Sequence, residues 1–428
     1  MLCIVHRSHS EQLCYKLANM KNRPETAMMS YGYKPFLSEG AVKCPIFMTS
    51  TFVFKTAEEG KDFFSMAYGR EPSQAREMGL IYSRINNPDI EILEERLKLW
   101  DDGEEAAAFS SGMSAISTTL MSFLKPGDCI LYSNPLYGGT HSYIHFFLAE
   151  WGIESIAFDA ADDAASIREN IGDKGSRLKM ILVETPANPT NDLIDIRLCA
   201  DIAASYSTAE KTVLLAVDNT YMGPLWSHPL KHGAHIVLYS ATKYIGGHSD
   251  VIAGVAVASK PVMAQIKMAR TFFGTIIDPH TSWLLLRSLE TLKIRMEAAA
   301  SNAKHVAQWL QQHPLVEKVY YLGFNETALN KRQYSSSGAM VSFDVKGGEA
   351  QAFAFLNALQ HIRLAVSLGG TESLAEHPFT MTHAGVPVDE KNRLGLTEKM
   401  IRLSIGIEHH EDIIRDISNA LDAIPVKK

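Results

Sequence analysis

The stretch Ser240-Ala-Thr-Lys-Tyr-Ile-Gly-Gly-His-Ser-Asp250 organises this chain. An apolar run, Ile236 to Tyr239, precedes it and predicts a buried strand, and the paired glycines let the backbone turn sharply beside whatever Lys243 holds. A lysine amine at a strand end can form an imine with an aldehyde, while the hydroxyls of Ser240 and Thr242 can donate hydrogen bonds to a phosphate. The stretch therefore predicts a covalent cofactor site, against the alternative of a solvated lysine that simply follows a strand.

A second apolar run, Val213 to Val217, ends at Asp218. On a strand next to the first, this carboxylate can pair with a protonated ring nitrogen of the same cofactor. A lysine imine together with such an aspartate is typical of pyridoxal phosphate sites. The predicted cofactor is therefore pyridoxal 5'-phosphate, held as an imine by Lys243, although Asp218 could instead cap a turn.

The composition is that of an ordinary globular protein. The 428 residues exceed what one hydrophobic core usually serves, so we expect two large units. Hydrophobic residues make up 46% and charged residues 21%, and 41 basic against 48 acidic residues give a net charge of -7. No basic run is interleaved with aromatics, so no nucleic-acid partner is expected.

The cysteines are scattered, odd in number and without a C-x-x-C pair: Cys3, Cys14, Cys44, Cys129 and Cys199. This pattern argues against a disulfide framework and a structural zinc site, and favours a reducing, cytoplasmic location. The histidines form no H-E-x-x-H motif, so no metal site is expected. The apolar start is too short for a signal peptide, and no run reaches the ~20 apolar residues of a membrane span.

Strands and helices alternate through the middle of the chain. From Asp89, apolar residues recur at helical spacing. Strands are expected at 129–132, 180–183, 213–217, 236–239 and 251–258, with helices at 140–151 and 198–206. This alternation predicts a mostly parallel sheet covered on both faces, whose ligands bind beyond the carboxyl ends of its strands.

The pattern divides the chain into three parts. Residues 1–85 are expected to form an N-terminal extension and arm, 86–290 the cofactor-binding domain, and 291–428 a smaller α+β domain. One long helix from about His280 past Trp309 is predicted to link the last two parts. Further strands are expected near 341–343, 364–366 and 401–405, and helices near 350–359 and 412–423.

Six motifs follow one another along the chain: Tyr82-Ser-Arg-x-x-Asn-Pro, Ser110-Ser-Gly-Met-Ser-Ala, Asn134-Pro-x-Tyr-Gly-Gly-Thr, Glu184-Thr-Pro-Ala-Asn-Pro, the stretch from Ser240 to Asp250, and Val366-Ser-Leu-Gly-Gly-x-Glu-Ser-Leu. Together they resemble the cysteine and methionine metabolism family of pyridoxal phosphate enzymes, which includes methionine γ-lyase, cystathionine γ-synthase and the cystathionine γ- and β-lyases. The resemblance extends from about residue 30 to the C-terminus. It implies an α/β fold of the aspartate aminotransferase-like kind, fold type I, with a mostly parallel seven-stranded sheet in the large domain.

The resemblance also implies the cofactor contacts. Lys243 would form the imine and then act as the base that moves protons, and Asp218 would keep the ring nitrogen protonated. Asn188 would hydrogen-bond the ring hydroxyl. The phosphate would be bound at a helix start and by hydroxyl groups, from Gly112, Met113, Ser240 and Thr242.

Two phosphate contacts would come from a neighbouring subunit. Tyr82 and Arg84 in the arm occupy positions that reach over to the partner's cofactor in this family, which implies a homo-oligomer, expected as a dimer of dimers. Arg84 could otherwise be a surface arginine after a turn. The segment Gly69 to Leu80, just before them, is longer than the family pattern, and the first 19 residues have no counterpart in it.

The substrate contacts follow from the same resemblance. Tyr137 would stack on the cofactor ring and protonate the leaving group, unless it is a core tyrosine. Arg402 would bind the substrate α-carboxylate bidentately, helped by Ser367, because a fork of donors suits a carboxylate better than a lysine does.

Two positions bear on the reaction. Val366 sits where cystathionine-cleaving lyases carry a glutamate for the distal amino group, so an apolar residue favours a thioether such as methionine. Gly139 sits where typical methionine γ-lyases carry a cysteine, whereas synthases and cystathionine lyases carry glycine. We expect γ-elimination of the methionine γ-lyase type, with cystathionine γ-synthase and then cystathionine γ-lyase as alternatives. A catalytically silent relative that only binds the cofactor is an alternative of a different class.

Overall fold

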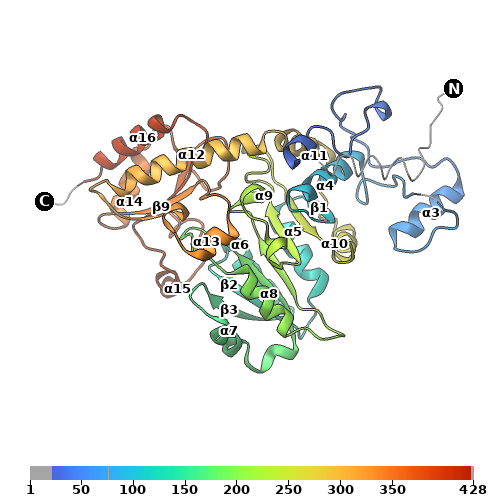
Figure 1. Cartoon of the computed structure of the whole chain (residues 1–428), viewed down its shortest axis with the longest axis horizontal. Coiled ribbons are helices and arrows are strands. Elements are labelled where there is room, and N and C mark those ends of the chain that lie inside the picture. The colour runs from blue at the N-terminus through green and yellow to red at the C-terminus, as the bar shows by residue number, and fades with distance from the viewer. Residues whose placement is uncertain (1–21, 76, 426–428) are drawn as a thin grey trace.

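The computed structural model describes residues 22–75 and 77–425 (Figure 1). Cys3, Cys14 and the first 19 residues lie outside this described part. Among the described residues before position 88, the helices are short: α2 (Pro24–Ala27), η1 (Pro35–Leu37) and α3 (Ala57–Ala67). Figure 1 shows α3 standing away from both sheets.

The large sheet has seven strands in the order β1-β7-β6-β5-β4-β2-β3. Its strands are β1 (Glu105–Phe109), β2 (Cys129–Asn134), β3 (Glu154–Asp159), β4 (Leu178–Glu184), β5 (Leu214–Asp218), β6 (Ile236–Ser240) and β7 (Gly254–Ala258). β7 runs antiparallel to both of its neighbours, β1 and β6, and the other neighbouring strands pair in parallel. The predicted seven-stranded, mostly parallel sheet is therefore confirmed.

Both faces of this sheet are buried because alternate side chains point to opposite sides. In β4, Leu182 faces a core shared with α5 (Gly112–Phe123) and α10 (Lys260–Phe273), whereas Val183 faces a core shared with α7 (Ala164–Ile171) and α8 (Ile196–Ser205). This two-sided burial explains why the strands are continuous apolar runs.

A second sheet follows in the C-terminal part, in the order β10-β11-β12-β9-β8. Its strands are β8 (Val316–Tyr320), β9 (Met340–Val345), β10 (Arg363–Leu364), β11 (Leu374–Glu376) and β12 (Met400–Ser404). Helices α12 (Leu292–Gln311), α14 (Glu349–Ala358) and α16 (His410–Asp422) lie along one side of it in Figure 1. The expected strand near 364–366 is shorter than predicted, so Val366 lies beyond its end.

The prediction of one long helix from His280 past Trp309 is wrong. The chain forms α11 (Pro279–Leu289) and α12, with a break at Glu290 and Thr291. The Arg295 side chain donates to Ser288 O at 3.0 Å and to Thr291 Oγ1 at 3.1 Å across the break. Since α11 packs on α4 (Pro88–Trp100) and α12 packs on the second sheet, a bend is needed where one domain gives way to the other.

The helix predicted at 140–151 also differs. It starts as α6 (Gly138–Ser142) and continues as a π-helical segment, Tyr143–Leu148. The remaining short elements are η3 (Gly172–Ser176), α9 (Gly223–Trp226), η4 (Pro229–His232), η5 (Leu322–Phe324), α13 (Ala328–Gln333) and α15 (Val388–Arg393).

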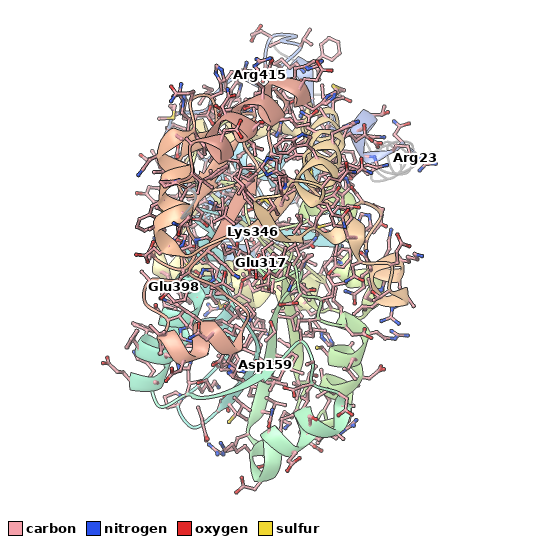
Figure 2. The ribbon with its side chains drawn as sticks, turned by 90° about the vertical axis from the view of Figure 1, so that its left-hand side faces the viewer. Arg23, Asp159, Glu317, Lys346, Glu398 and Arg415 are labelled. Carbon is pink, nitrogen blue, oxygen red and sulfur yellow. The ribbon has the colours of Figure 1, made fainter. Side chains whose placement is uncertain are left out.

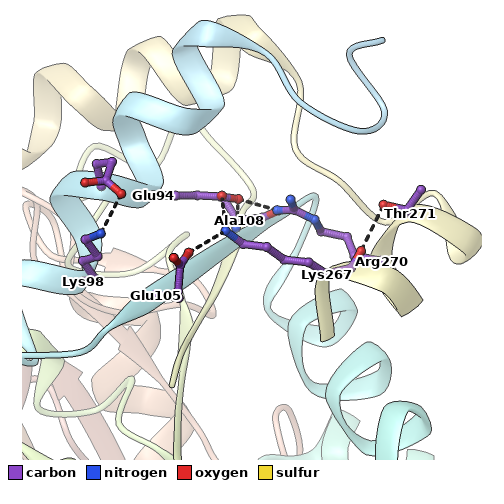
Figure 3. A network of polar contacts seen from close by, with 8 residues as sticks. Glu94, Lys98, Glu105, Ala108, Lys267, Arg270 and Thr271 are labelled. Atoms are coloured by element: carbon purple, nitrogen blue, oxygen red, sulfur yellow. Dashed lines mark hydrogen bonds and ion pairs between the residues drawn. The ribbon is translucent and has the colours of Figure 1, made fainter. Parts of the chain in front are cut away.

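A buried ionic network joins α4, β1 and α10 (Figure 3). Glu94 accepts the Ala108 N–H at 3.0 Å and pairs with Arg270 and Lys267, and Lys267 also reaches Glu105 at 3.1 Å. Although burial opposes it, the two cations lower the pKa of Glu94. The network fixes the edge strand beside the start of α5.

The small domain also contacts the large sheet through α15. Arg393 pairs with Asp159, which Figure 2 labels at the end of β3, and Glu390 accepts a hydrogen bond from Asn134 at 3.0 Å. These contacts place the segment before α15 over the carboxyl ends of the strands. Among the described residues, no helix combines the length and apolar character needed to cross a membrane.

Candidate active site

A cavity of about 670 Å³ opens at the carboxyl ends of β4, β5 and β6, between the large sheet and the second sheet. Most of the predicted site residues line it, namely Gly112, Met113, Tyr137, Gly139, Asn188, Asp218, Ser240, Thr242, Lys243, Val366, Ser367 and Arg402. These residues come from distant parts of the sequence and meet because parallel strands end at one edge.

Tyr82 and Arg84 are the two predicted site residues that do not line the cavity of their own chain. Tyr82 is 41% exposed in the arm, and Arg84 donates to Thr271 O at 2.6 Å. The Arg84 guanidinium lies 5.9 Å from the centre of the Tyr82 ring. The pair therefore stays together on the surface of the arm.

Lys243 follows β6 and points toward the second sheet. Its Nζ donates to Ser367 Oγ at 2.8 Å. Burial, and then the nearby positive charge of Arg402, lower its pKa to about 8. An amine with this pKa has a substantial neutral fraction near pH 8, far more than an ordinary lysine, so it can act as a nucleophile or a base.

Ser367 has a strained backbone, with φ of 105°. A non-glycine residue rarely adopts this conformation. The strain places two of its groups at the site: Oγ faces Lys243, and its carbonyl accepts from Arg402 Nη2 at 2.7 Å. Strained backbone of this kind is a frequent feature of functional sites.

Asp218 ends β5 and is buried. Its Oδ1 accepts two hydrogen bonds from Thr220, from the backbone N–H at 3.0 Å and from the hydroxyl at 2.6 Å. Burial raises its pKa, and no ion pair with a basic side chain forms at Asp218 within the described chain. A buried carboxylate facing the cavity in this way fits a ligand that brings its own positive charge.

Glu184 ends β4 directly opposite Asp218 in register. Its Oε2 accepts the backbone N–H of Tyr137 at 2.7 Å. Burial and the neighbouring Asp218 raise the pKa of Glu184 to about 8. Because two adjacent buried carboxylates do not both ionise readily, the pair of Glu184 and Asp218 favours a state that holds one proton.

The start of α5 forms the opposite end of the cavity. Ser111 caps this helix by accepting the Ser114 N–H at 2.9 Å. A Cβ atom at Gly112 would lie 2.7 Å from Ser240 Cβ, so only glycine leaves the helix start open beside Ser240. The first N–H groups of a helix attract anions, and this one fits a phosphate. The Thr242 hydroxyl already donates to the Ala253 carbonyl at 3.3 Å and accepts the Ala253 N–H at 3.1 Å, so donation to a phosphate would require it to leave the first bond.

Tyr137 stands at the N-terminus of α6 and is 44% exposed. A Cβ atom at Gly139 would lie 2.6 Å from the Tyr137 ring and 3.3 Å from the Met113 sulfur. The glycine therefore allows the ring to lie over the start of α6.

Arg402 in β12 is 2% exposed and holds three partners. Its Nη1 contacts Asn188 Oδ1 at 3.1 Å and Glu376 Oε1 at 2.6 Å, while Nη2 contacts the Ser367 carbonyl. Asn188 thus contacts Arg402 as well as lining the cavity.

Sequence reasoning gave no role to several residues at the site: Glu184, Thr220, Tyr221, Ile252, Glu376, Met381 and Thr382. Glu184 stood inside a quoted motif, and its strand-end position matched that of Asp218. The position of Glu376 opposite Arg402 depends on strand pairing, which no local pattern reveals.

The residues present fit pyridoxal phosphate. A buried amine with lowered pKa suits its aldehyde, an unpaired buried carboxylate suits its ring nitrogen, and a helix start beside a hydroxyl suits its phosphate. When bound there, the cofactor supplies an electron sink for the bond-breaking steps at the substrate.

Comparisons with known proteins agree with this fit. A family model described as Cys/Met metabolism PLP-dependent enzyme matches residues 25–422. The L-methionine gamma-lyase of Pseudomonas deceptionensis is 39% identical over 404 residues, covering 93% of this chain and 97% of the relative. The cystathionine gamma-lyase of Bacillus subtilis is 39% identical over 408 residues, covering 94% and 100%.

Among solved structures, cystathionine gamma synthase from Xanthomonas oryzae pv. oryzae, in complex with aminoacrylate and cysteine, superposes with a TM-score of 0.84 at 32% identity. The match covers 94% of this chain and 98% of that one. The chain therefore belongs to the Cys/Met metabolism family of pyridoxal-phosphate-dependent enzymes.

Proposed function

We propose that this enzyme catalyses γ-elimination of the methionine γ-lyase type, converting L-methionine and water to 2-oxobutanoate, methanethiol and ammonia. The observation that carries the proposal is the apolar part of the cavity lining, to which Val366, Ile252, Leu368 and Met381 contribute. A thioether side chain has no charge or strong donor to satisfy, so an apolar wall suits it. The relatives named L-methionine gamma-lyase, at 36% to 39% identity, support the same choice.

In this proposal each side chain has a defined task. Arg402 binds the substrate α-carboxylate, and Ser367 holds the Lys243 amine in place. Lys243 removes the proton from the substrate Cα and then moves protons at Cβ, because about half of its amine is neutral near pH 8. Tyr137 donates a proton to the departing sulfur. Glu184 fixes the backbone of Tyr137.

Cystathionine γ-synthase chemistry, in which cysteine replaces the γ substituent of an O-acyl-homoserine, is the second candidate. Gly139 favours it, since glycine is the residue expected of synthases at this position. A cysteine side chain there would begin 2.6 Å from the Tyr137 ring and would have to displace it.

The test is incubation of the purified holoenzyme with L-methionine and measurement of 2-oxobutanoate. Formation of the keto acid supports the proposal. No keto acid, together with cystathionine formed from cysteine and an O-acyl-homoserine, would favour the synthase. No reaction with either substrate set, in a protein that binds the cofactor, would favour a silent relative.

We also propose a homo-oligomer, expected as a dimer of dimers, in which Tyr82 and Arg84 complete the phosphate site of a partner subunit. The exposure of Tyr82, and the absence of both residues from the lining of their own chain's cavity, support the proposal.

A further inference from the structure

Arg402 is already paired with a carboxylate of its own chain. Glu376 ends β11 opposite Arg402, its Oε1 lies 2.6 Å from Arg402 Nη1, and its side chain is fully buried. Thr382 donates to the same oxygen at 3.1 Å. Within the described residues, the other oxygen, Oε2, has no hydrogen-bond partner.

This pair creates a charge problem when a substrate binds. An incoming α-carboxylate adds a second negative charge to a guanidinium whose charge Glu376 already balances. Leaving an excess charge in a buried site is costly. The other titratable groups around Glu376 do not neutralise this excess negative charge. Lys243 is partly neutral near pH 8, and burial lowers the pKa of His383 to about 4. Tyr221 is buried and neutral.

We propose that Glu376 is a positioning residue for Arg402 and takes up one proton from solvent when the substrate α-carboxylate binds. The inference rests on the proposed role of Arg402 in binding that carboxylate. Glu376 Oε2 is the oxygen placed to carry the proton, while Oε1 continues to accept from Arg402 and Thr382. The bound state then has one guanidinium and one ionised carboxylate, that of the substrate.

The surroundings of Glu376 favour this protonation. Burial raises its pKa above the ordinary value, although Arg402 and the Thr382 hydroxyl oppose the shift. A substrate carboxylate that shares Arg402 weakens this opposition. Because a proton enters with the ligand, affinity for carboxylates should fall about tenfold for each pH unit above the pKa of Glu376.

The test uses the holoenzyme and 4-(methylthio)butanoate, which is methionine without its amino group and therefore cannot react with the cofactor. Calorimetric titration in two buffers of different ionisation enthalpy, at about pH 8, counts the protons taken up. Glu376→Gln keeps an oxygen that accepts from Arg402 but cannot gain a proton. Glu372→Gln, four residues earlier and outside the cavity lining, is the matched control.

We expect proton uptake in the parent and in Glu372→Gln, no uptake in Glu376→Gln, and a pH-independent affinity only in Glu376→Gln. Equal uptake in all three proteins would assign the proton to another group, such as Lys243, and would overturn the inference while leaving the role of Arg402 intact. A parent affinity that is constant from about pH 6.5 to 8.5 would overturn it even if the variant does not fold. Absence of binding to any of the proteins would overturn both the inference and the carboxylate role of Arg402.

Discussion

Lys243 acquires its chemistry from neighbours that lie far from it in the sequence. Ser367 and Arg402 both come from the C-terminal part, and burial between the two sheets is the main reason that the pKa of Lys243 falls to about 8. The rate at which cofactor-free protein takes up pyridoxal phosphate, followed by absorbance of the bound cofactor, should therefore rise with pH around a midpoint near this value and level off above it. A midpoint near the ordinary ~10.4 of a lysine would contradict this environment.

Val366 provides a residue-scale test of substrate choice. Val366→Glu should lower kcat/KM for methionine by about tenfold or more, because a carboxylate at the apolar wall must be desolvated by the thioether. The same variant should gain activity on cystathionine, whose distal ammonium can pair with the new charge. The measurement is kcat/KM on both substrates. Val366→Gln, whose side chain resembles glutamate in shape but is neutral, should lose activity on methionine without gaining activity on cystathionine. Equal gains on cystathionine in both variants would rule out a charge effect.

Asp101 carries a stability prediction. It is fully buried, and burial raises its pKa to about 7 despite the hydrogen bond from Tyr239 at 2.7 Å. Since the folded pKa exceeds the unfolded value of about 3.9, folding favours the protonated form, and stability declines as pH rises from about 4 to 7. Above pH 7, the ionised Asp101 lowers the free energy of unfolding by on the order of 4 kcal/mol.

Asp101→Asn should therefore raise the unfolding midpoint more at pH 8 than at pH 5, measured by thermal denaturation of the holoenzyme. Asp102→Asn is the adjacent control, because Asp102 is exposed and pairs with Lys231 at 2.8 Å on the surface. A gain that is equal at both pH values would show that the charge of Asp101 is not the cause.

At the scale of elements, the Glu94 network joins α4, β1 and α10 near the phosphate end of the cavity. Glu94→Gln leaves Arg270, which is 3% exposed, without its ionic partner. We expect a loss of about 3–5 kcal/mol in the free energy of unfolding, as is typical when one member of a buried pair is removed.

Urea denaturation of the variant checks this value. Glu95→Gln, the next residue, removes a charge that is 35% exposed and pairs with Lys98, so it should change stability by less than about 1 kcal/mol. Because the cations lower the pKa of Glu94, the stabilisation in the parent should persist above pH 5 and be lost as pH falls through the lowered pKa. Equal losses in the two variants would contradict a buried network.

At the scale of the whole molecule, subunit complementation tests the arm. Arg84→Ala and Lys243→Ala should each be inactive alone if the arm serves the partner's site. In a mixed dimer, the subunit that retains Lys243 receives Arg84 from its partner, so one site is complete. Co-expression at equal levels should restore about a quarter of parental activity, since about half of the dimers are mixed and half of their sites are complete. No recovery in a mixture that forms mixed dimers would place Arg84 in its own site.

Some parts of the fold could be predicted from the sequence and others could not. Strands β2, β4, β5 and β6 were predicted because they are buried on both faces and therefore continuously apolar. The break between α11 and α12 was missed, because apolar spacing continues across Glu290 and only the need to pack on two domains bends the chain there.

The sequence by itself determined the cofactor chemistry of this protein, because a lysine, an aspartate and a glycine helix start each follow an apolar strand, and parallel strands bring their ends together. Only the tertiary structure decided how these groups behave. The pairing of β11 with β12 sets Glu376 against Arg402, and the adjacent ends of β4 and β5 set Glu184 beside Asp218. Ionisation depends on burial and on charges within a few ångströms, and those neighbours come from strand pairing rather than from the local sequence.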